Sequence, residues 1–198
     1  MRPLLFLDVD GPLIPFGAPP PYTYPCHAPV PPPGAHPLLH RVDPAHGRRL
    51  AGLGCELVWA TTWGEAANEV LAPRLGLRPL PVVDWPEELE EELEEELEEE
   101  TVAELEADFG ADFGAGLHWK TRPLSVWAGG RPYVWLDDEI RPADRAWAAA
   151  HHPAPALLRR VDPRTGLGDA DYAAVTAWVV RVAEELCGRE AEEPRGRE

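Results

Sequence analysis

The chain has 198 residues, 44% of them hydrophobic, and a formal net charge of −17. Its length predicts one domain, and its apolar content is enough for a core. Fourteen acidic residues fall within residues 87–108, which hold no basic residue, so the rest of the chain is nearly balanced in charge. The absence of a basic field argues against a dedicated nucleic-acid-binding surface.

Three cysteines, Cys26, Cys55 and Cys187, form no C-x-x-C motif and leave an odd thiol. This usage is typical of a reducing compartment rather than of a disulfide framework. No apolar run approaches the length of a membrane span, and the run before Asp8 is too short for a signal peptide. We therefore expect a soluble, cytoplasmic protein without membrane contact.

The first expected element is a strand that ends in acid. An apolar run from residue 4 breaks into Asp8-Val9-Asp10, and Gly11-Pro12 follows at once. A continuous apolar run indicates a buried strand, which Gly-Pro ends. Both carboxylates would then lie on one side of the carboxyl end of the strand, where open α/β sheets build sites, and Mg²⁺ would offset their repulsion. A turn formed by Asp-Gly alone explains this short motif equally well.

A proline-rich segment follows directly. Residues 12–37 include eleven prolines, a density that excludes regular helix and central strand. The segment is either a linker or a flap over the strand end. Its position after Asp10 favours the flap, with Phe16, Tyr22 and Tyr24 as apolar contacts.

Helices and strands then alternate up to residue 84. The expected elements are a helix over 43–53, a strand over 56–61, a helix over 65–75 closed by Gly76, and a short strand over 81–84. The strand over 56–61 also ends in polar residues, Thr61 and Thr62. Asn68, one turn into the following helix, is weighed as a further contact to a bound anion.

Residues 86–116 form an acidic, low-complexity insert. Leucine recurs every fourth residue between 89 and 97 among glutamates, which gives only a thin apolar stripe. Like charges four residues apart oppose a helix. We expect a solvated or frayed helix or a disordered segment, with contact to a protein partner as the alternative.

The second half repeats the pattern and ends in a charged tail at 189–198. A helix over 118–128, a strand over 133–138, a strand over 156–161 and a helix over 169–187 are expected. The strand over 133–138 ends in the pair Asp137-Asp138. Strands that alternate with helices predict an α/β fold, a Rossmann-like, doubly wound parallel sheet formed as one domain over residues 1–188.

Lysine usage singles out one residue. The chain has seventeen arginines and one lysine, Lys120, at a helix start between the second and third polar strand ends. Arginine and lysine are not interchangeable where a compact charge must reach one anion. An ordinary surface lysine is the alternative interpretation.

Other polar and aromatic residues receive structural interpretations. The histidines at 36, 40 and 46 lie in or beside the proline-rich segment without a thiolate partner, which argues against a metal site. His151 and His152 precede a proline and indicate a turn. The tryptophans, including Trp63 and Trp135, are expected in the core.

The order Asp8-x-Asp10, strand-end Thr, lone Lys and strand-end Asp pair resembles the four motifs of the haloacid dehalogenase superfamily. A finer pattern, V-W-A-T-T-W, W-K, V-W-L-D-D-E and V-D-P-x-x-G-L, is similar to the haloacid dehalogenase-like domain associated with Swiss Army Knife RNA repair proteins. This resemblance covers nearly the whole chain apart from the acidic insert. It implies a Rossmann-like core without a large cap domain, and a Mg²⁺-dependent hydrolase.

The resemblance also implies roles for the two aspartates and the metal. Asp8 would be the nucleophile that forms an aspartyl-phosphate, and Asp10 the general acid and then the base. Mg²⁺ would be held by Asp8, by the backbone carbonyl of Asp10 and by the acidic pair, where Asp137 is preferred over Asp138.

Substrate contacts follow from the same resemblance. Thr61, or Thr62 in its place, would bind the phosphoryl oxygens together with nearby backbone N–H groups, including that of Gly11, and Lys120 would neutralise developing charge. The implied activity is hydrolysis of a phosphomonoester, on a small molecule or a nucleic-acid end. The competing hypothesis is a non-catalytic module that binds phosphorylated ligands or proteins, which would have no need of Asp10.

Overall fold

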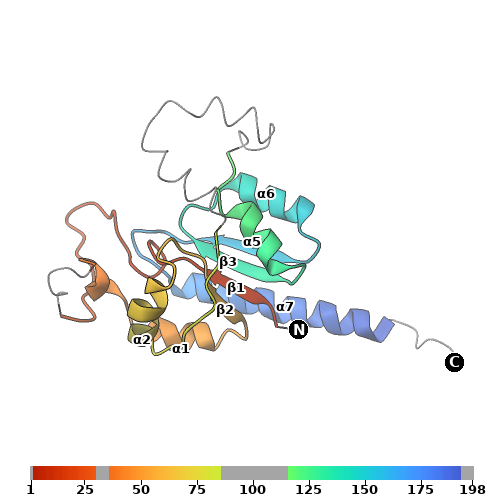
Figure 1. The fold of residues 1–198 in the computed structure, drawn as a ribbon, viewed down its shortest axis with the longest axis horizontal. Helices are drawn as coiled ribbons and strands as arrows, with labels where there is room; N and C mark the ends of the chain where they lie inside the picture. Colours follow the sequence, from red (N-terminus) through yellow and green to blue (C-terminus); the bar gives the residue numbers. More distant parts are fainter. Residues whose placement is uncertain (1, 30–35, 86–115, 193–198) are drawn as a thin grey trace.

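The computed structural model describes residues 2–29, 36–85 and 116–192, with side chains through residue 185 (Figure 1). The expectations for the acidic insert, at residues 86–115, and for most of the charged tail lie outside the described residues.

A four-stranded, all-parallel sheet forms the centre of the molecule (Figure 1). The strands are β1 (Leu4–Leu7), β2 (Glu56–Trp59), β3 (Tyr133–Asp137) and β4 (Ala156–Arg160), in the order β2-β1-β3-β4. The residues of β1 and β3 are buried throughout, because helices cover both faces of a parallel sheet. The predicted α/β class with a parallel sheet is therefore confirmed.

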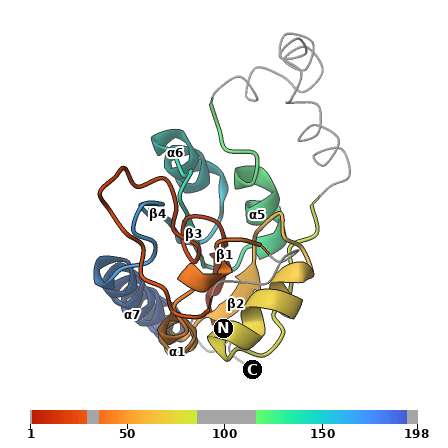
Figure 2. The same cartoon turned by 90° about the vertical axis from the view of Figure 1, so that its left-hand side faces the viewer.

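Helices lie on both faces of the sheet (Figures 1 and 2). α5 (Thr121–Ala128) and α6 (Pro142–His151) cover one face. The remaining helices are η1 (Leu39–Arg41), α1 (Ala45–Ala51), η2 (Ala67–Leu71), α2 (Ala72–Leu75) and α7 (Asp169–Glu192). Of these, α1, η2, α2 and α7 cover the other face of the sheet. None of the described helices combines the length and hydropathy needed to cross a bilayer.

Alternate residues of β1 enter two separate cores. Leu5 and Leu7 pack with the α1, α2 and α7 side, whereas Leu4 and Phe6 pack with the α5 and α6 side. All four are fully buried, and each such side chain contributes roughly 1.5–3 kcal/mol relative to an exposed one. The central strand is thereby fixed in register.

Two expectations for secondary structure are wrong. Residues 81–84 form no strand: Val82 makes one isolated bridge to Trp59, and Pro81 has no N–H with which to continue a ladder. No helix was expected over 142–151, where α6 lies, and His151 ends that helix instead of forming a turn. α6 is rich in alanine, so its apolar periodicity is weak, although Pro142 in its first turn is an ordinary start signal.

The order of the strands marks one place for a site. From β1 the chain forms β2 on one side, and then β3 on the other side of β1. The carboxyl ends of β1 and β3 therefore flank the point at which the strand order reverses, where open α/β sheets bind ligands.

Candidate active site at the carboxyl edge of the sheet

Asp8 and Asp137 lie side by side at this point. Leu7 pairs with Leu136 in the sheet, and the Asp8 N–H donates to the Leu136 carbonyl at 3.0 Å. Asp8 is 8% exposed and Asp137 is 1% exposed. The position predicted for Asp8, just past its strand, is the one observed, and the neighbouring strand brings a second buried carboxylate beside it.

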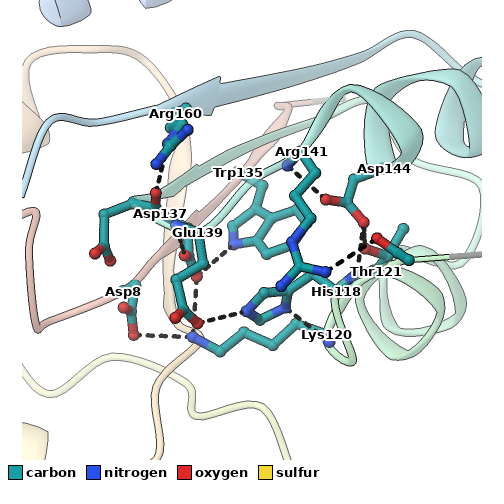
Figure 3. Close-up of polar contacts among 12 residues, drawn as sticks. Asp8, His118, Lys120, Thr121, Trp135, Asp137, Glu139, Arg141, Asp144 and Arg160 are labelled. Carbon is teal, nitrogen blue, oxygen red and sulfur yellow. Dashed lines mark hydrogen bonds and ion pairs between the residues drawn. The ribbon is translucent and has the colours of Figure 1, made fainter.

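Lys120 joins the two carboxylates (Figure 3). Its Nζ lies 3.0 Å from Asp8 Oδ1 and 2.9 Å from Asp137 Oδ2, and the residue is 5% exposed. Two carboxylates against one ammonium leave one negative charge in excess. The only lysine of the chain is thus a buried partner of the strand-end acids rather than a surface residue.

Asp137 is held by further donors. The Trp135 indole N–H donates to its Oδ2 at 3.2 Å, and the Glu139 backbone N–H donates to its Oδ1 at 2.9 Å. With Lys120 also on Oδ2, most of the acceptor positions of this carboxylate are in use. The orientation of Asp137 is therefore fixed by the strand, the turn after it and the lysine.

Asp138 lies against the loop that follows Asp10. Gly11 has a φ of +81°, and a Cβ built on it would lie 2.6 Å from the Asp138 Cγ. Only glycine fits there, because any side chain would be strained and would displace Asp138. The Gly11 N–H donates to the Ile14 carbonyl at 3.1 Å, so the expectation that this amide binds substrate finds no support in the loop geometry.

The three carboxylates can hold a cation. Oxygens of Asp8, Asp137 and Asp138 lie within 4.8 Å of one another. An all-oxygen donor set with an excess of negative charge fits a hard divalent cation as a class, Mg²⁺ among them.

The pKa values reflect this crowding of charge. Burial raises the pKa of Asp8 to about 7, with Lys120 opposing the shift and Asp137 adding to it. Burial, together with Asp137, raises the pKa of Asp138 to about 6. Burial disfavours the charged form of Lys120, but Asp8 and Asp137 outweigh it and raise the pKa of the ammonium. A bound cation would favour the ionised carboxylates.

A second group, His118, Asp137 and Glu139, is also close enough to hold a metal. Its hydrogen bonds argue against that role. The Lys120 N–H donates to His118 Nδ1 at 3.1 Å, so the ring proton lies on Nε2, which is 3.0 Å from Glu139 Oε2. A metal would need the Nε2 lone pair, and ligating histidines usually donate from the other nitrogen. This group orients Lys120 and the turn after β3.

Asp10 is held on the β2 side of the site. Its Oδ2 accepts the Trp63 indole N–H at 2.8 Å, and the residue is half-buried. Its carboxylate belongs to neither cluster of the described residues that could hold a metal. The structure therefore separates the second aspartate from the lysine-bridged pair.

Thr61 reaches the same edge from β2. Leu7 pairs with Trp59 and the Ala60 N–H donates to the Leu7 carbonyl, so Ala60 lies level with Asp8 and Thr61 is the next residue along this edge. Thr61 is buried, and its Oγ1 accepts the Trp63 backbone N–H at 3.3 Å, whereas Thr62 is exposed in the turn. Burial beside the cluster favours Thr61 over Thr62.

Comparison with protein-family models, curated proteins and solved structures gives no match for this chain. The haloacid dehalogenase resemblance therefore rests on the sequence motifs alone.

Three partly exposed tryptophans surround the site. Trp63 contacts Asp10, the Trp85 indole N–H donates to the Thr61 carbonyl at 3.2 Å, and the Lys120 Nζ lies 5.4 Å from the Trp119 ring centre. The core assignment is right for Trp135 but incomplete for Trp63, which packs at the margin of the core. Trp119 is part of the W-K motif quoted above, whereas Trp85 gave no signal in the sequence beyond its residue type.

A buried carboxylate on α6 also serves the site from outside it. Asp144 accepts the His118 backbone N–H at 2.7 Å, the Thr121 hydroxyl at 2.6 Å and the Arg141 backbone N–H at 2.6 Å (Figure 3). It thereby joins the start of α6 to the segment that carries Lys120. Its spacing after Arg141 is a capping signal, but its long-range partners could not be read from the sequence.

Asn68 and the proline-rich segment have structural contacts. The Asn68 amide bonds the Trp59 indole and the Leu80 backbone, so the expected anion contact is not made. In the described part of the segment, the Phe16 N–H donates to the Pro163 carbonyl at 2.7 Å, which anchors the segment to the turn after β4.

Proposed function

We propose that this protein is a divalent-cation-dependent phosphatase that hydrolyses a phosphomonoester through an aspartyl-phosphate on Asp8. The observation that carries the proposal is the buried set Asp8, Lys120 and Asp137 at the sheet edge, with a separately held acid, Asp10, two residues after Asp8. Membership of the haloacid dehalogenase superfamily is part of the same proposal.

Asp8 supplies the nucleophile. Lys120 lies on Oδ1, so the other carboxylate oxygen attacks phosphorus, forms the new P–O bond and displaces the ester oxygen. Lys120 stays close enough to offset charge on the phosphoryl oxygens, and Thr61, two residues after β2 at the same edge of the sheet, adds a hydroxyl donor.

Asp10 handles the proton. Its Oδ2 is fixed by the Trp63 indole N–H, so Oδ1 gives its proton to the leaving oxygen. In the second step the same carboxylate takes a proton from water, which attacks phosphorus and releases Asp8. A non-catalytic binding module has no use for an acid held in this way.

Asp8 and Asp138 would hold the cation, with Asp137 contributing through the acceptor position that remains to it. We prefer Asp138 here, in place of the Asp137 that the resemblance favours, because Asp137 is already held by Lys120, Trp135 and Glu139. When bound, Mg²⁺ supplies positive charge between the nucleophile and the phosphoryl group.

The test is hydrolysis of 4-nitrophenyl phosphate with Mg²⁺ and with EDTA, by the wild type, Asp8→Asn and Asp10→Asn. Asp169→Asn is the matched control, since the Asp169 side chain is 96% exposed and pairs only with Arg49 among the described residues. We expect Mg²⁺-dependent turnover in the wild type and the control, and a loss of at least about 1,000-fold in Asp8→Asn.

A panel of 5′- and 3′-phosphorylated oligonucleotides, nucleotides and sugar phosphates extends the same assay to substrate class. A wild type without turnover on any member, but with saturable binding of phosphate esters, would instead identify a phospho-ligand module.

A further inference from the structure

A pocket of about 550 Å³ opens next to the acidic cluster, on the β4 side. One wall is formed by Phe16 and Gly17 of the proline-rich segment, and the other by residues 160–164 at the end of β4 and in the turn after it. The Phe16 to Pro163 hydrogen bond joins the two walls. The pocket is therefore defined by two segments that hold each other in place.

Arg160 connects this pocket to the cluster. It is the last residue of β4 and pairs with Asp137 in the sheet, and its Nε donates to the Asp138 carbonyl at 2.7 Å (Figure 3). Asp8 lies level with Asp137 on the next strand, so Arg160 is two strands from Asp8, roughly 10 Å at the backbone. A molecule with one end at Asp8 can thus reach the pocket with the other.

The lining of the pocket holds two arginines, Arg160 and Arg164, and one acid, Asp162, and therefore has a net positive charge. Asp162 holds the Arg164 guanidinium through two hydrogen bonds, at 2.9 and 2.8 Å. Asp162 also attracts Arg160, but the hydrogen bond of Arg160 goes to a backbone carbonyl, and among the described residues Arg160 forms no ion pair with an acid. Phe16, 38% exposed, adds an apolar face.

We propose that this pocket receives the leaving group and that Arg160 selects a phosphomonoester whose leaving group bears a second anion, a phosphate or carboxylate on the order of 10 Å from the reacting phosphoryl group. A guanidinium suits this task because its planar fork binds such anions through two hydrogen bonds. The inference rests on the proposed phosphatase function. Sugar bisphosphates and nucleoside bisphosphates share the required chemistry.

The experiment compares Arg160→Gln and Arg160→Lys with Arg145→Gln. Arg145 is a matched control: it is exposed, its Nε also donates to a backbone carbonyl, of Leu158 at 2.9 Å, and it does not line the pocket. For each protein, kcat and KM are measured with Mg²⁺ on two pairs of substrates, each a bisphosphate with its monophosphate, and on a reference substrate whose leaving group carries no second anion. The pairs are fructose 1,6-bisphosphate with fructose 6-phosphate, and adenosine 3′,5′-bisphosphate with adenosine 5′-monophosphate; the reference is 4-nitrophenyl phosphate.

We expect the wild type to prefer the bisphosphate in at least one pair, and that pair identifies the sugar or the nucleotide as the source. Arg160→Gln should lower kcat/KM for that bisphosphate by about ten-fold or more, mainly through KM, because a charged hydrogen bond is lost. Arg160→Lys should recover part of the loss. The reference substrate and Arg145→Gln should change less than about two-fold.

The outcomes separate the two proposals. Turnover of 4-nitrophenyl phosphate with no preference for either bisphosphate, or with an equal loss on all substrates in Arg160→Gln, overturns this inference and leaves the phosphatase intact. No turnover on any substrate overturns both. If Arg160→Gln has a lowered Tm, Arg160→Lys replaces it. A full loss of preference in Arg160→Lys, which keeps the charge, would contradict the role of the charge, and an unchanged preference would contradict the role of the guanidinium fork.

Discussion

Burial has opposite effects on stability in the interior of β1 and at its carboxyl end. Leu4–Leu7 are fully buried among apolar side chains, where burial is favourable. Asp8, the next residue, is nearly as buried, but it shares one ammonium with a second carboxylate and its pKa is raised to about 7. Within one residue of the end of β1, burial thus changes from a favourable into an unfavourable contribution to stability.

This difference shows that the buried carboxylate at the site reduces the stability of the folded state. A raised carboxyl pKa means that the folded state binds the proton of Asp8 more tightly than the unfolded state does. The contribution of Asp8 to stability therefore falls as the pH rises from about 4 to about 7. Such residues are typical of functional positions rather than of structural ones.

Replacement of Lys120 by methionine should cause the largest loss of stability among these variants. It leaves Asp8 and Asp137 facing each other without their shared cation, and loss of one partner of a buried ion pair costs about 3–5 kcal/mol. Urea unfolding at pH 8 in EDTA measures the change. Leu5→Ala is the apolar reference, with an expected loss of about 2–5 kcal/mol that does not depend on pH.

Lys120→Met should also recover stability as the pH falls, because protonation of either carboxylate removes the repulsion. A loss that is the same at pH 5 and pH 8 would contradict the charge argument and reduce Lys120 to a packing residue.

Asp8→Asn should change the stability in the opposite direction from Lys120→Met. Asparagine resembles the protonated carboxyl group, and Lys120 keeps Asp137 as a partner. In EDTA the variant should be more stable than the wild type above about pH 7 and equal to it below about pH 4, because the wild-type Asp8 is then protonated in both states. Thermal melts across this pH range test the sign.

Addition of Mg²⁺ to the same thermal melts tests whether Asp8 binds the cation. Millimolar Mg²⁺ should raise the Tm of the wild type more than that of Asp8→Asn, because binding to the folded state alone stabilises it. A Tm of Asp8→Asn below that of the wild type at pH 8 in EDTA would contradict this argument and show that the ionised Asp8 stabilises the folded state.

Trp63→Phe should give the smallest effect. It removes the hydrogen bond to Asp10 Oδ2 but keeps an aromatic ring at the margin of the core. We expect little change in Tm and a loss of about ten-fold in kcat, since one hydrogen bond to a charged group contributes at least about 1.5 kcal/mol. Thermal melts and steady-state kinetics on 4-nitrophenyl phosphate check both expectations, and a loss of Tm that parallels the loss of kcat would indicate simple packing instead.

The sequence alone determined the strands and the places where they end. Buried parallel strands are continuous apolar runs, so β1, β2, β3 and β4 could be predicted within a residue or two, and the acids that follow β1 and β3 with them. Gly76 and Gly129 end their helices in the left-handed conformation. These signals are local, which is why they could be read.

The tertiary structure decided which side chains meet. The hydrogen bond from Trp63 to Asp10 spans 53 residues, and that from Lys120 to Asp137 spans 17. Neither follows from periodicity, because such contacts depend on the order and register of strands that pair far apart in the chain. The same register places Arg160 beside Asp137. The resemblance grouped Lys120 and the acidic pair with Asp8, but only the fold shows which oxygens Lys120 contacts and adds Arg160 to the group.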